Sequence, residues 1–534
     1  MQKKIKDIKI FLKNNFGLLL VLASFLFLAF WNFFKQGIIN FDEAYFVVVI
    51  RTFSSIAKTL IFNHSSFFSG NFLSELAANY GNIYTAARPS YILPASFLAI
   101  FISPEYASRL LSLFSGFLGV IFFYRLLKLF GIKDAALRAW LTLPMAISPL
   151  YLLYSRLGLS QIFSAACVII SLYYLIVFYQ GGDKKFLKIF SFSTAILFMS
   201  HYNVMFVVAV LLFFGILALI KHAGKFKDWF LYLFYFLFLP VSWEVITRCA
   251  SFFAGKRALV GPVLSYSQEY LKQVIGVSSG QSTEVFGQSL YYLKLLTLAD
   301  GWLILVLFIL GLVFLIYKLK RFEHQVVFFS FFVSLLAFSA GQLKYSRNFV
   351  CILPLVYLII ALSVCGFSAY FDKKTNKRAT WLVGFVVLLV FASHFFVYQN
   401  YLNIHSGAKE TASYIKNNYN QADALILGWS SPIWRVYLPG YRAEQLIRLE
   451  EWRPLVNDKT KLLLVDDYFT VILDDNDLDG GYSKKNVFSV QTNIFRSEPV
   501  ILDFLYGTPE KMSELFSKNK SSYTSVYEVI NVKK

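Results

Sequence analysis

The chain has 534 residues, of which 57% are hydrophobic, 19% aromatic and only 15% charged. Because an average soluble domain has roughly 25% charged residues, this composition excludes an ordinary soluble protein and predicts a membrane protein. The formal net charge of +20 would fit nucleic-acid binding only if the basic residues formed one face. They form short clusters between apolar runs instead, so we expect no nucleic-acid partner.

The basic clusters predict the membrane topology, because Lys and Arg mark the cytoplasmic side of a membrane protein. The first apolar run, FGLLLVLASFLFLAFWNFF, is about one bilayer span long and lacks a small-residue cleavage site, which indicates a retained anchor. With a cytoplasmic N-terminus, the sequence predicts a multi-pass protein of the cell (plasma) membrane. It is mostly α, with about eleven transmembrane helices near residues 16–35, 107–127, 138–155, 160–180, 187–201, 203–221, 229–249, 299–317, 325–342, 349–367 and 381–399.

The first outer loop, residues 36–106, is long for a connection in a compact bundle. Its apolar stretches AYFVVVI and YILPASFLAIFISP are too short to cross a bilayer. We therefore expect them to form helices that lie at the interface or re-enter it, and we expect a functional site at the outer membrane surface.

Beyond residue 400 the composition becomes mixed polar and apolar. GAKETASYIKNNY has helical spacing, ADALILG and KLLLVDD are typical of buried strands, and SSYTSVYEVINV alternates like a half-exposed strand. The chain is thus predicted to consist of a transmembrane domain, residues 1–400, and an extracytoplasmic α/β domain, residues 401–534.

Asp42 and Glu43, in NFDEAYFVVVIRTF, begin a segment whose next seven residues are apolar or aromatic. An acid at membrane depth costs about 2.5 kcal/mol or more unless it is paired or hydrated. One interpretation is helix capping, since Asp is a good N-cap and a negative charge suits a helix N-terminus. The other is a catalytic base or a metal-binding carboxylate facing a cavity, and the two are compatible. A divalent metal stays open, because the pair lacks a complete ligand pattern.

Several cations lie on the predicted outer side, where Arg in particular could bind a phosphate with two hydrogen bonds. Arg88 adjoins an interfacial apolar stretch, where an Arg usually snorkels. Arg109 lies within the outer end of a predicted span, where the alternative to a functional role is an inter-helix salt bridge. A third group of candidate phosphate-binding residues lies just before the tenth predicted span and consists of Lys344, Tyr345 and Arg347. The alternative to phosphate binding by this group is contact with lipid headgroups.

Arg156, in YSRLGLSQ, and His201, in SHYN, also lie at predicted outer turns. As a single Arg and a single His they favour a structural role over a functional one. Taken with the other cations and with the acids of the first loop, they nevertheless lie on one side of the membrane, which predicts a reaction chamber there.

FDEAY after the first helix, then ARPSYILP, ASRLLSLFSG, SPLYLLYSRLGLSQ and KYSRNFVCILP, form an ordered set over roughly residues 10 to 400. The set resembles the polytopic GT-C glycosyltransferases, in the branch of the protein O-mannosyltransferases (family 39) and the bacterial lipid A aminoarabinose transferase. Two positions depart from that pattern. Gln161 stands where relatives commonly carry an acid, and Arg347 is followed by Asn348 where relatives often show Arg-Tyr.

The resemblance implies a lipid-phosphate-dependent glycosyltransferase that moves a sugar from a polyprenyl-phosphate carrier to a protein, lipid or glycan outside the cytoplasm. By position, Asp42 would be the general base or would orient the acceptor, and Glu43 would be its neighbour or a metal contact. Arg88, Arg109 and Arg347 would serve the donor phosphate or the acid network. A single inverting displacement is the simpler mechanism, since no second nucleophile is evident.

Two other functions stay open. A transporter or lipid flippase also has many helices and intramembrane charge, but transporters usually show inverted repeats and ionisable residues at the midplane. A non-catalytic scaffold that presents the C-terminal domain is the third hypothesis, and it predicts that Asp42 is dispensable.

Overall fold

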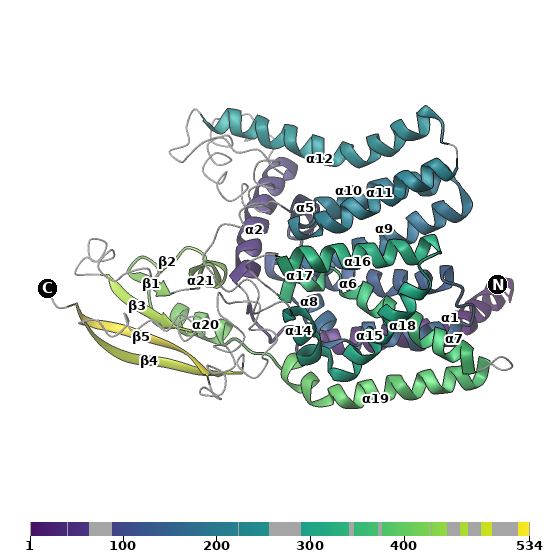
Figure 1. Cartoon of the computed structure of the whole chain (residues 1–534). Helices are drawn as coiled ribbons and strands as arrows, with labels where there is room; N and C mark the ends of the chain where they lie inside the picture. The colour runs from purple at the N-terminus through teal and green to yellow at the C-terminus, as the bar shows by residue number, and fades with distance from the viewer. Residues whose placement is uncertain are drawn as a thin grey trace. The chain divides into compact units, whose positions relative to one another are not determined.

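A computed structural model (Figure 1) provides the structure of the protein. The structure describes residues 2–39, 41–62, 88–222, 224–255, 290–340, 346–371, 376–428, 430–445, 460–467, 482–493 and 522–532.

The chain divides into two compact units. The helical unit comprises Met1–Phe30 and Val49–Phe396, and the α/β unit comprises Trp31–Val48 and Val397–Lys534. The first residues of the predicted outer loop thus belong to the same unit as the C-terminal region.

The helical unit is built from helices that run side by side over much of its length (Figure 1). Two further helices contain residues of both units, namely α2 (Phe41–Phe62) and α19 (Asn376–Leu402). The helical unit's other elements are α1 (Gln2–Phe30), α5 (Pro89–Leu98), α6 (Pro104–Leu129), α7 (Ala135–Ala146), α8 (Pro149–Arg156), α9 (Ser160–Gly181), α10 (Lys184–Phe198), η1 (Tyr202–Val204), α11 (Met205–Lys221), α12 (Phe226–Gly255), α14 (Tyr291–Asp300), α15 (Trp302–Tyr317), α16 (Phe322–Ala340), α17 (Ser346–Val350) and α18 (Leu353–Phe371).

A multi-pass membrane protein is supported by five helices in the described residues that are long and apolar enough to cross a bilayer, or six if one bent pair is a single span. The predicted count of eleven is not confirmed. Four shorter apolar segments fall at other predicted spans: Asn15–Phe30, Trp302–Tyr317, Leu353–Gly366 and Val383–Ala392.

The predicted span 138–155 is not one straight helix, because α7 and α8 meet at a bend of 65°. Pro149 begins α8, where its missing N–H costs nothing, and the preceding Ser148 has left helical geometry. The Ser148 hydroxyl accepts a hydrogen bond from the Tyr151 amide at 3.1 Å and so caps the second helix. The break makes α8 a separate short helix with its own N-cap.

Small residues and hydroxyl groups fix the helices around α6. Gly116 and Gly119 leave room for α8, since the Tyr151 hydroxyl donates to the Gly116 carbonyl at 2.9 Å and a side chain at Gly119 would overlap that hydroxyl. On another side, the Tyr91 hydroxyl of α5 lies 2.9 Å from the Ser112 hydroxyl of α6. These buried contacts set the positions of α5 and α8.

The α/β unit contains a five-stranded sheet in the order β2-β1-β3-β5-β4. β1 pairs in parallel with β2 and β3, while β5 pairs antiparallel with β3 and β4. Leucines of β1 and β3 form its core, with Tyr527 and Val529 packed against them. The elements are α20 (Ala408–Asn418), β1 (Ala424–Gly428), α21 (Ser431–Tyr437), β2 (Arg442–Gln445), β3 (Lys461–Asp466), β4 (Tyr482–Thr492) and β5 (Ser522–Val532), which confirms the predicted helix and three predicted strands.

Candidate functional site

The acid pair lies in the first turn of α2, in the part of that helix that belongs to the α/β unit. Because the helix begins at Phe41, Asp42 is its second residue and is not the residue before the helix, as capping by Asp42 would require. The carboxylate of Glu43 takes a related role, since its Oε2 accepts from the Ile39 amide at 3.4 Å. In a capping box the third-position Glu binds the amide of the residue directly before the helix, so this contact, one residue earlier, is a related way of satisfying an amide at the helix start.

The two acids differ in exposure. Glu43 is fully buried, and Asp42 is only partly buried. Both are near the positive end of the helix dipole, which stabilises negative charge by about 0.3–1 kcal/mol at each site. Of the two, Asp42 is therefore the carboxylate that a substrate could reach.

A second group of candidate residues meets in the helical unit around His201. The Arg88 Nη2 atom, at the start of α5, lies 3.1 Å from His201 Nε2, although the two residues are far apart in the sequence. Gln161, near the start of α9, places its amide nitrogen 3.3 Å from the same ring atom. The structure thus joins Arg88, His201 and Gln161, which the sequence analysis treated separately.

The ring of His201 is surrounded by hydrogen-bond donors. Its Nδ1 accepts from the Asn203 amide at 3.1 Å, so in the neutral ring the proton is on Nε2, the atom that faces Arg88. The amide of Gln161 can turn its oxygen toward that proton, but a guanidinium has donors only. The contact between the Arg88 guanidinium and His201 Nε2 is therefore a close approach of two donor groups, and the Asn203 amide is the donor that the ring accepts.

The electrostatics of His201 agree with this geometry. Burial lowers the pKa of His201 well below its ordinary value, and the positive charges of Arg88 and Arg347 lower it further. The positive charge of Arg347, on α17, therefore acts on the His201 ring, as the charge of Arg88 does. Next to it in the sequence, Asn348 accepts a hydrogen bond from the Asn203 side chain, which links α17 to the segment that carries His201. We call Arg88, His201 and Arg347 the cation cluster.

Arg109 and Arg156 are both fully buried. Arg109 forms an ion pair with Glu105 at 3.1 Å, one turn away in the same helix, α6. Arg156 is the last residue of α8, where the negative end of the helix dipole favours a cation. The positive charge of Arg109 repels that of Arg156. The predicted Lys344 and Tyr345 lie outside the described residues.

The sequence analysis missed Asp300, a fully buried acid at the end of α14. Its Oδ1 accepts from the Ser148 hydroxyl, the cap of α8, at 2.8 Å. Asp300 lies at the outer end of the predicted span 299–317, so the criterion that singled out Asp42 would have found it.

The described residues contain no group of three or more His, Cys, Asp or Glu side chains that could hold a metal ion. The acid pair by itself supplies two carboxylates, fewer ligands than Ca²⁺ takes, whereas Mg²⁺ is usually bound by one or two carboxylates together with substrate phosphates and water.

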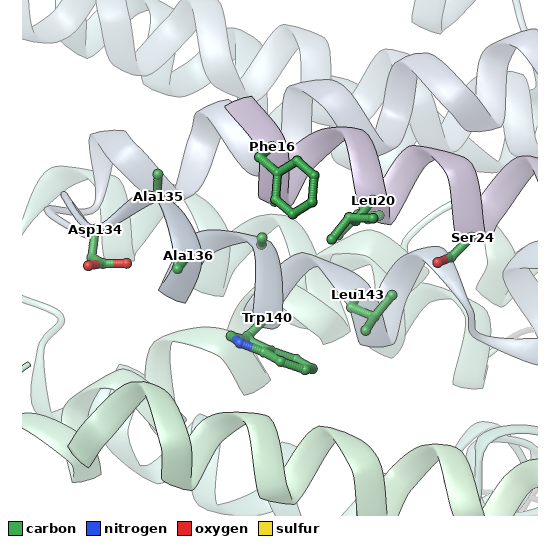
Figure 2. Close-up of a pocket in the computed structure, with 11 residues that line it drawn as sticks. Phe16, Leu20, Ser24, Asp134, Ala135, Ala136, Trp140 and Leu143 are labelled. Atoms are coloured by element: carbon green, nitrogen blue, oxygen red, sulfur yellow. The ribbon is translucent and has the colours of Figure 1, made fainter. Parts of the chain in front are cut away.

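An apolar cavity of about 630 Å³ lies between α1 and α7 (Figure 2). Phe16 and Leu20 of α1 and Trp140 and Leu143 of α7 line it, and Asp134 lies at one end. Such a lining suits a hydrocarbon chain. No residue of the cation cluster lines this cavity, so it is distinct from the polar site.

Comparison with known proteins places these observations in a family context. The family model of the dolichyl-phosphate-mannose-protein mannosyltransferases matches residues 89–246, less than half of the chain. This segment includes Arg109, Arg156, Gln161 and His201. No curated protein matches the sequence.

Solved structures share the fold over nearly the whole chain. ArnT from Cupriavidus metallidurans in the apo state matches with a TM-score of 0.56 at 11% identity, covering 88% of this chain and 96% of that one. The same protein bound to undecaprenyl phosphate matches with a TM-score of 0.55 at 11% identity, covering 95% and 97%. The predicted resemblance to the mannosyltransferases and to ArnT is thus confirmed, and the fold is ArnT-like.

Proposed function

We propose that the protein is a membrane glycosyltransferase that uses a polyprenyl-phosphate-linked sugar as donor. The observation that carries this proposal is the convergence of the partly buried Arg88 and Arg347 on the buried His201 within an ArnT-like fold. ArnT itself has been solved with undecaprenyl phosphate bound, which supports a lipid phosphate as the ligand of the cation cluster.

In this proposal the cation cluster binds the donor phosphate. A polyprenyl phosphate leaves as a phosphomonoester, whose second pKa is near 6, so the departing group needs charge stabilisation more than it needs a proton. Arg88 and Arg347 supply that charge, and His201, neutral because of its burial, adds an Nε2–H donor beside the Arg88 guanidinium. Arg109 and Arg156 are both buried, and the charge of Arg109 acts on Arg156. In this proposal they add to the positive electrostatic potential that attracts the donor phosphate.

Asp42 serves as the general base for the acceptor hydroxyl. The acceptor oxygen forms a bond to the anomeric carbon, while the bond from that carbon to the phosphate oxygen breaks and its electron pair leaves with the phosphate. The acceptor's proton passes to the Asp42 carboxylate as the new bond forms, an effect typically worth 10² to 10⁴ in rate. One displacement of this kind inverts the anomeric configuration.

The roles of Glu43 and of a metal are separate proposals. Glu43 is held by the Ile39 amide and is fully buried, so we assign it to orienting the start of α2. If a divalent metal takes part, Asp42 is the carboxylate placed to bind it, with the remaining ligands from substrate phosphate and water, and Glu43 would join it only by releasing the Ile39 amide.

A transfer assay distinguishes this function from a transporter or flippase. Purified protein in proteoliposomes would receive a polyprenyl-phosphate sugar labelled in the sugar, with lipid, glycan and protein fractions of a membrane extract as acceptors. A glycosyltransferase produces free polyprenyl phosphate and a labelled covalent product. A flippase moves the labelled lipid between leaflets with its phosphodiester intact, and that result would refute the proposal.

A further inference from the structure

The segment that precedes the acid pair is bound to the C-terminal part of the chain. Residues 31–39 belong to the α/β unit, although they follow directly on the first helix in the sequence. The Asn403 side chain accepts from both Trp31 Nε1, at 3.2 Å, and Asn32 Nδ2, at 2.7 Å. Lys409 donates to the Phe34 carbonyl at 2.8 Å. Three residues near the start of the segment are thus fixed.

The next contact is made at Gly37 and depends on the absence of a side chain there. Ser406 donates its backbone amide to the Gln36 carbonyl at 3.3 Å. Gly37 has a φ of +69°, in the left-handed region that favours glycine. A Cβ at Gly37 would lie 2.5 Å from the Ser406 hydroxyl oxygen, closer than real contacts allow. The segment therefore lies directly against Ser406.

The last contact is made at Ile38, the residue before Ile39, whose amide binds Glu43. The Ile38 amide donates to the Tyr437 hydroxyl, at the end of α21, at 2.8 Å. The following amide, that of Ile39, donates to Glu43. Ile38 and Ile39 are both fully buried, so neither amide can exchange its partner for bulk water without a local opening. Tyr437 thus holds the backbone one residue before the amide that binds Glu43.

We infer that the C-terminal α/β region positions the catalytic acid of the first loop, with Tyr437 as its main positioning residue. This inference rests on the proposed function for the role of Asp42. It assigns to the C-terminal region a part in the chemical step that is additional to any contact with the acceptor. Removal of the Tyr437 hydroxyl leaves the buried Ile38 amide without its acceptor, so the segment shifts and carries the start of α2 with it.

Tyr437→Phe is the test, and Tyr441→Phe is its matched control. Tyr441 is also partly buried in the α/β unit, and its hydroxyl donates to the Tyr419 carbonyl at 2.8 Å, away from residues 31–39. We expect kcat for sugar transfer to fall about 10- to 100-fold in Tyr437→Phe, because small misplacements of reacting groups have effects of that order. The KM for the donor and the unfolding temperature should stay close to those of Tyr441→Phe.

A disulfide provides an independent measurement. A Cβ at Gly37 would lie 3.8 Å from the Ser406 Cβ, the mean separation in disulfides. In the double variant Gly37→Cys/Ser406→Cys, peptide mass spectrometry should find residues 37 and 406 joined.

Hydrogen exchange separates this inference from the proposed function. Peptides that cover residues 31–48 should exchange faster in Tyr437→Phe than in the wild type or in Tyr441→Phe. Unchanged exchange, or changed exchange with unchanged kcat, would overturn the positioning role. If the wild type transfers no sugar, the proposed function fails and the catalytic part of the inference fails with it, while exchange and cross-linking still decide the anchoring.

Discussion

Replacing Arg88 with Gln tests the cation cluster. The guanidinium of Arg88 lies 3.1 Å from His201 Nε2 and is partly buried, so an anion bound there would be only partly screened by water. A hydrogen bond to a charged group contributes about 1.5–3 kcal/mol. At 1.4 kcal/mol for each factor of ten, Arg88→Gln should weaken the binding of polyprenyl phosphate about 10- to 150-fold.

The matched control is Arg125→Gln. Arg125 is an exposed cation of α6, positioned over the ring of Phe122, so it carries the same charge without belonging to the cluster. Affinity for short-chain polyprenyl phosphate would be measured by calorimetry in detergent at two salt concentrations. If Arg88→Gln and Arg125→Gln bind equally well, the cluster does not hold the phosphate.

Two further predictions concern stability. The pKa of His201 is lower in the folded protein than its ordinary value of 6.5, so below that pH the unfolded chain binds a proton that the native protein does not, and stability decreases as pH falls, by at most about 1.4 kcal/mol per unit. Comparing unfolding temperatures at about pH 7.5 and about pH 5.5 should show a smaller decrease for His201→Asn than for the wild type, and an equal decrease would contradict the assigned electrostatics. Glu105→Gln should destabilise the protein by about 3 kcal/mol, because it leaves the buried charge of Arg109 without its ion pair. The double variant Glu105→Gln/Arg109→Met should recover most of that loss in chemical denaturation, and no recovery would mean that the ion pair is not the cause.

Much of the C-terminal architecture could be predicted from local patterns. The period of apolar residues identified α20, β1, β3 and β5, because these elements bury one face or both. The helical unit was harder, since span counting assumes one straight helix for each apolar run. Pro149 and the cap at Ser148 divide one such run into α7 and α8, and Phe-rich composition alone does not reveal where a helix ends.

The candidate site was only partly accessible from the sequence. Single charges such as Arg88 and His201 could be recognised as unusual at a membrane surface, but their contact depends on how α5, α9 and η1 pack. The anchoring of residues 31–39 by Asn403, Ser406 and Tyr437 carried no sequence signal, since its hydrogen bonds join positions about 370 to 400 residues apart. Such long-range contacts follow from the fold and leave no periodic pattern.

The most direct measurement is kcat for sugar transfer from a polyprenyl-phosphate donor by Asp42→Asn, beside Asp183→Asn as control. Asp183 is exposed and caps α10, accepting from the Lys185 amide at 2.8 Å, and Asn is an equally good cap. Loss of a general base should lower kcat by about 10²-fold or more in Asp42→Asn, while Asp183→Asn should transfer sugar like the wild type. Transfer by Asp42→Asn at the wild-type rate would show that Asp42 is not the base.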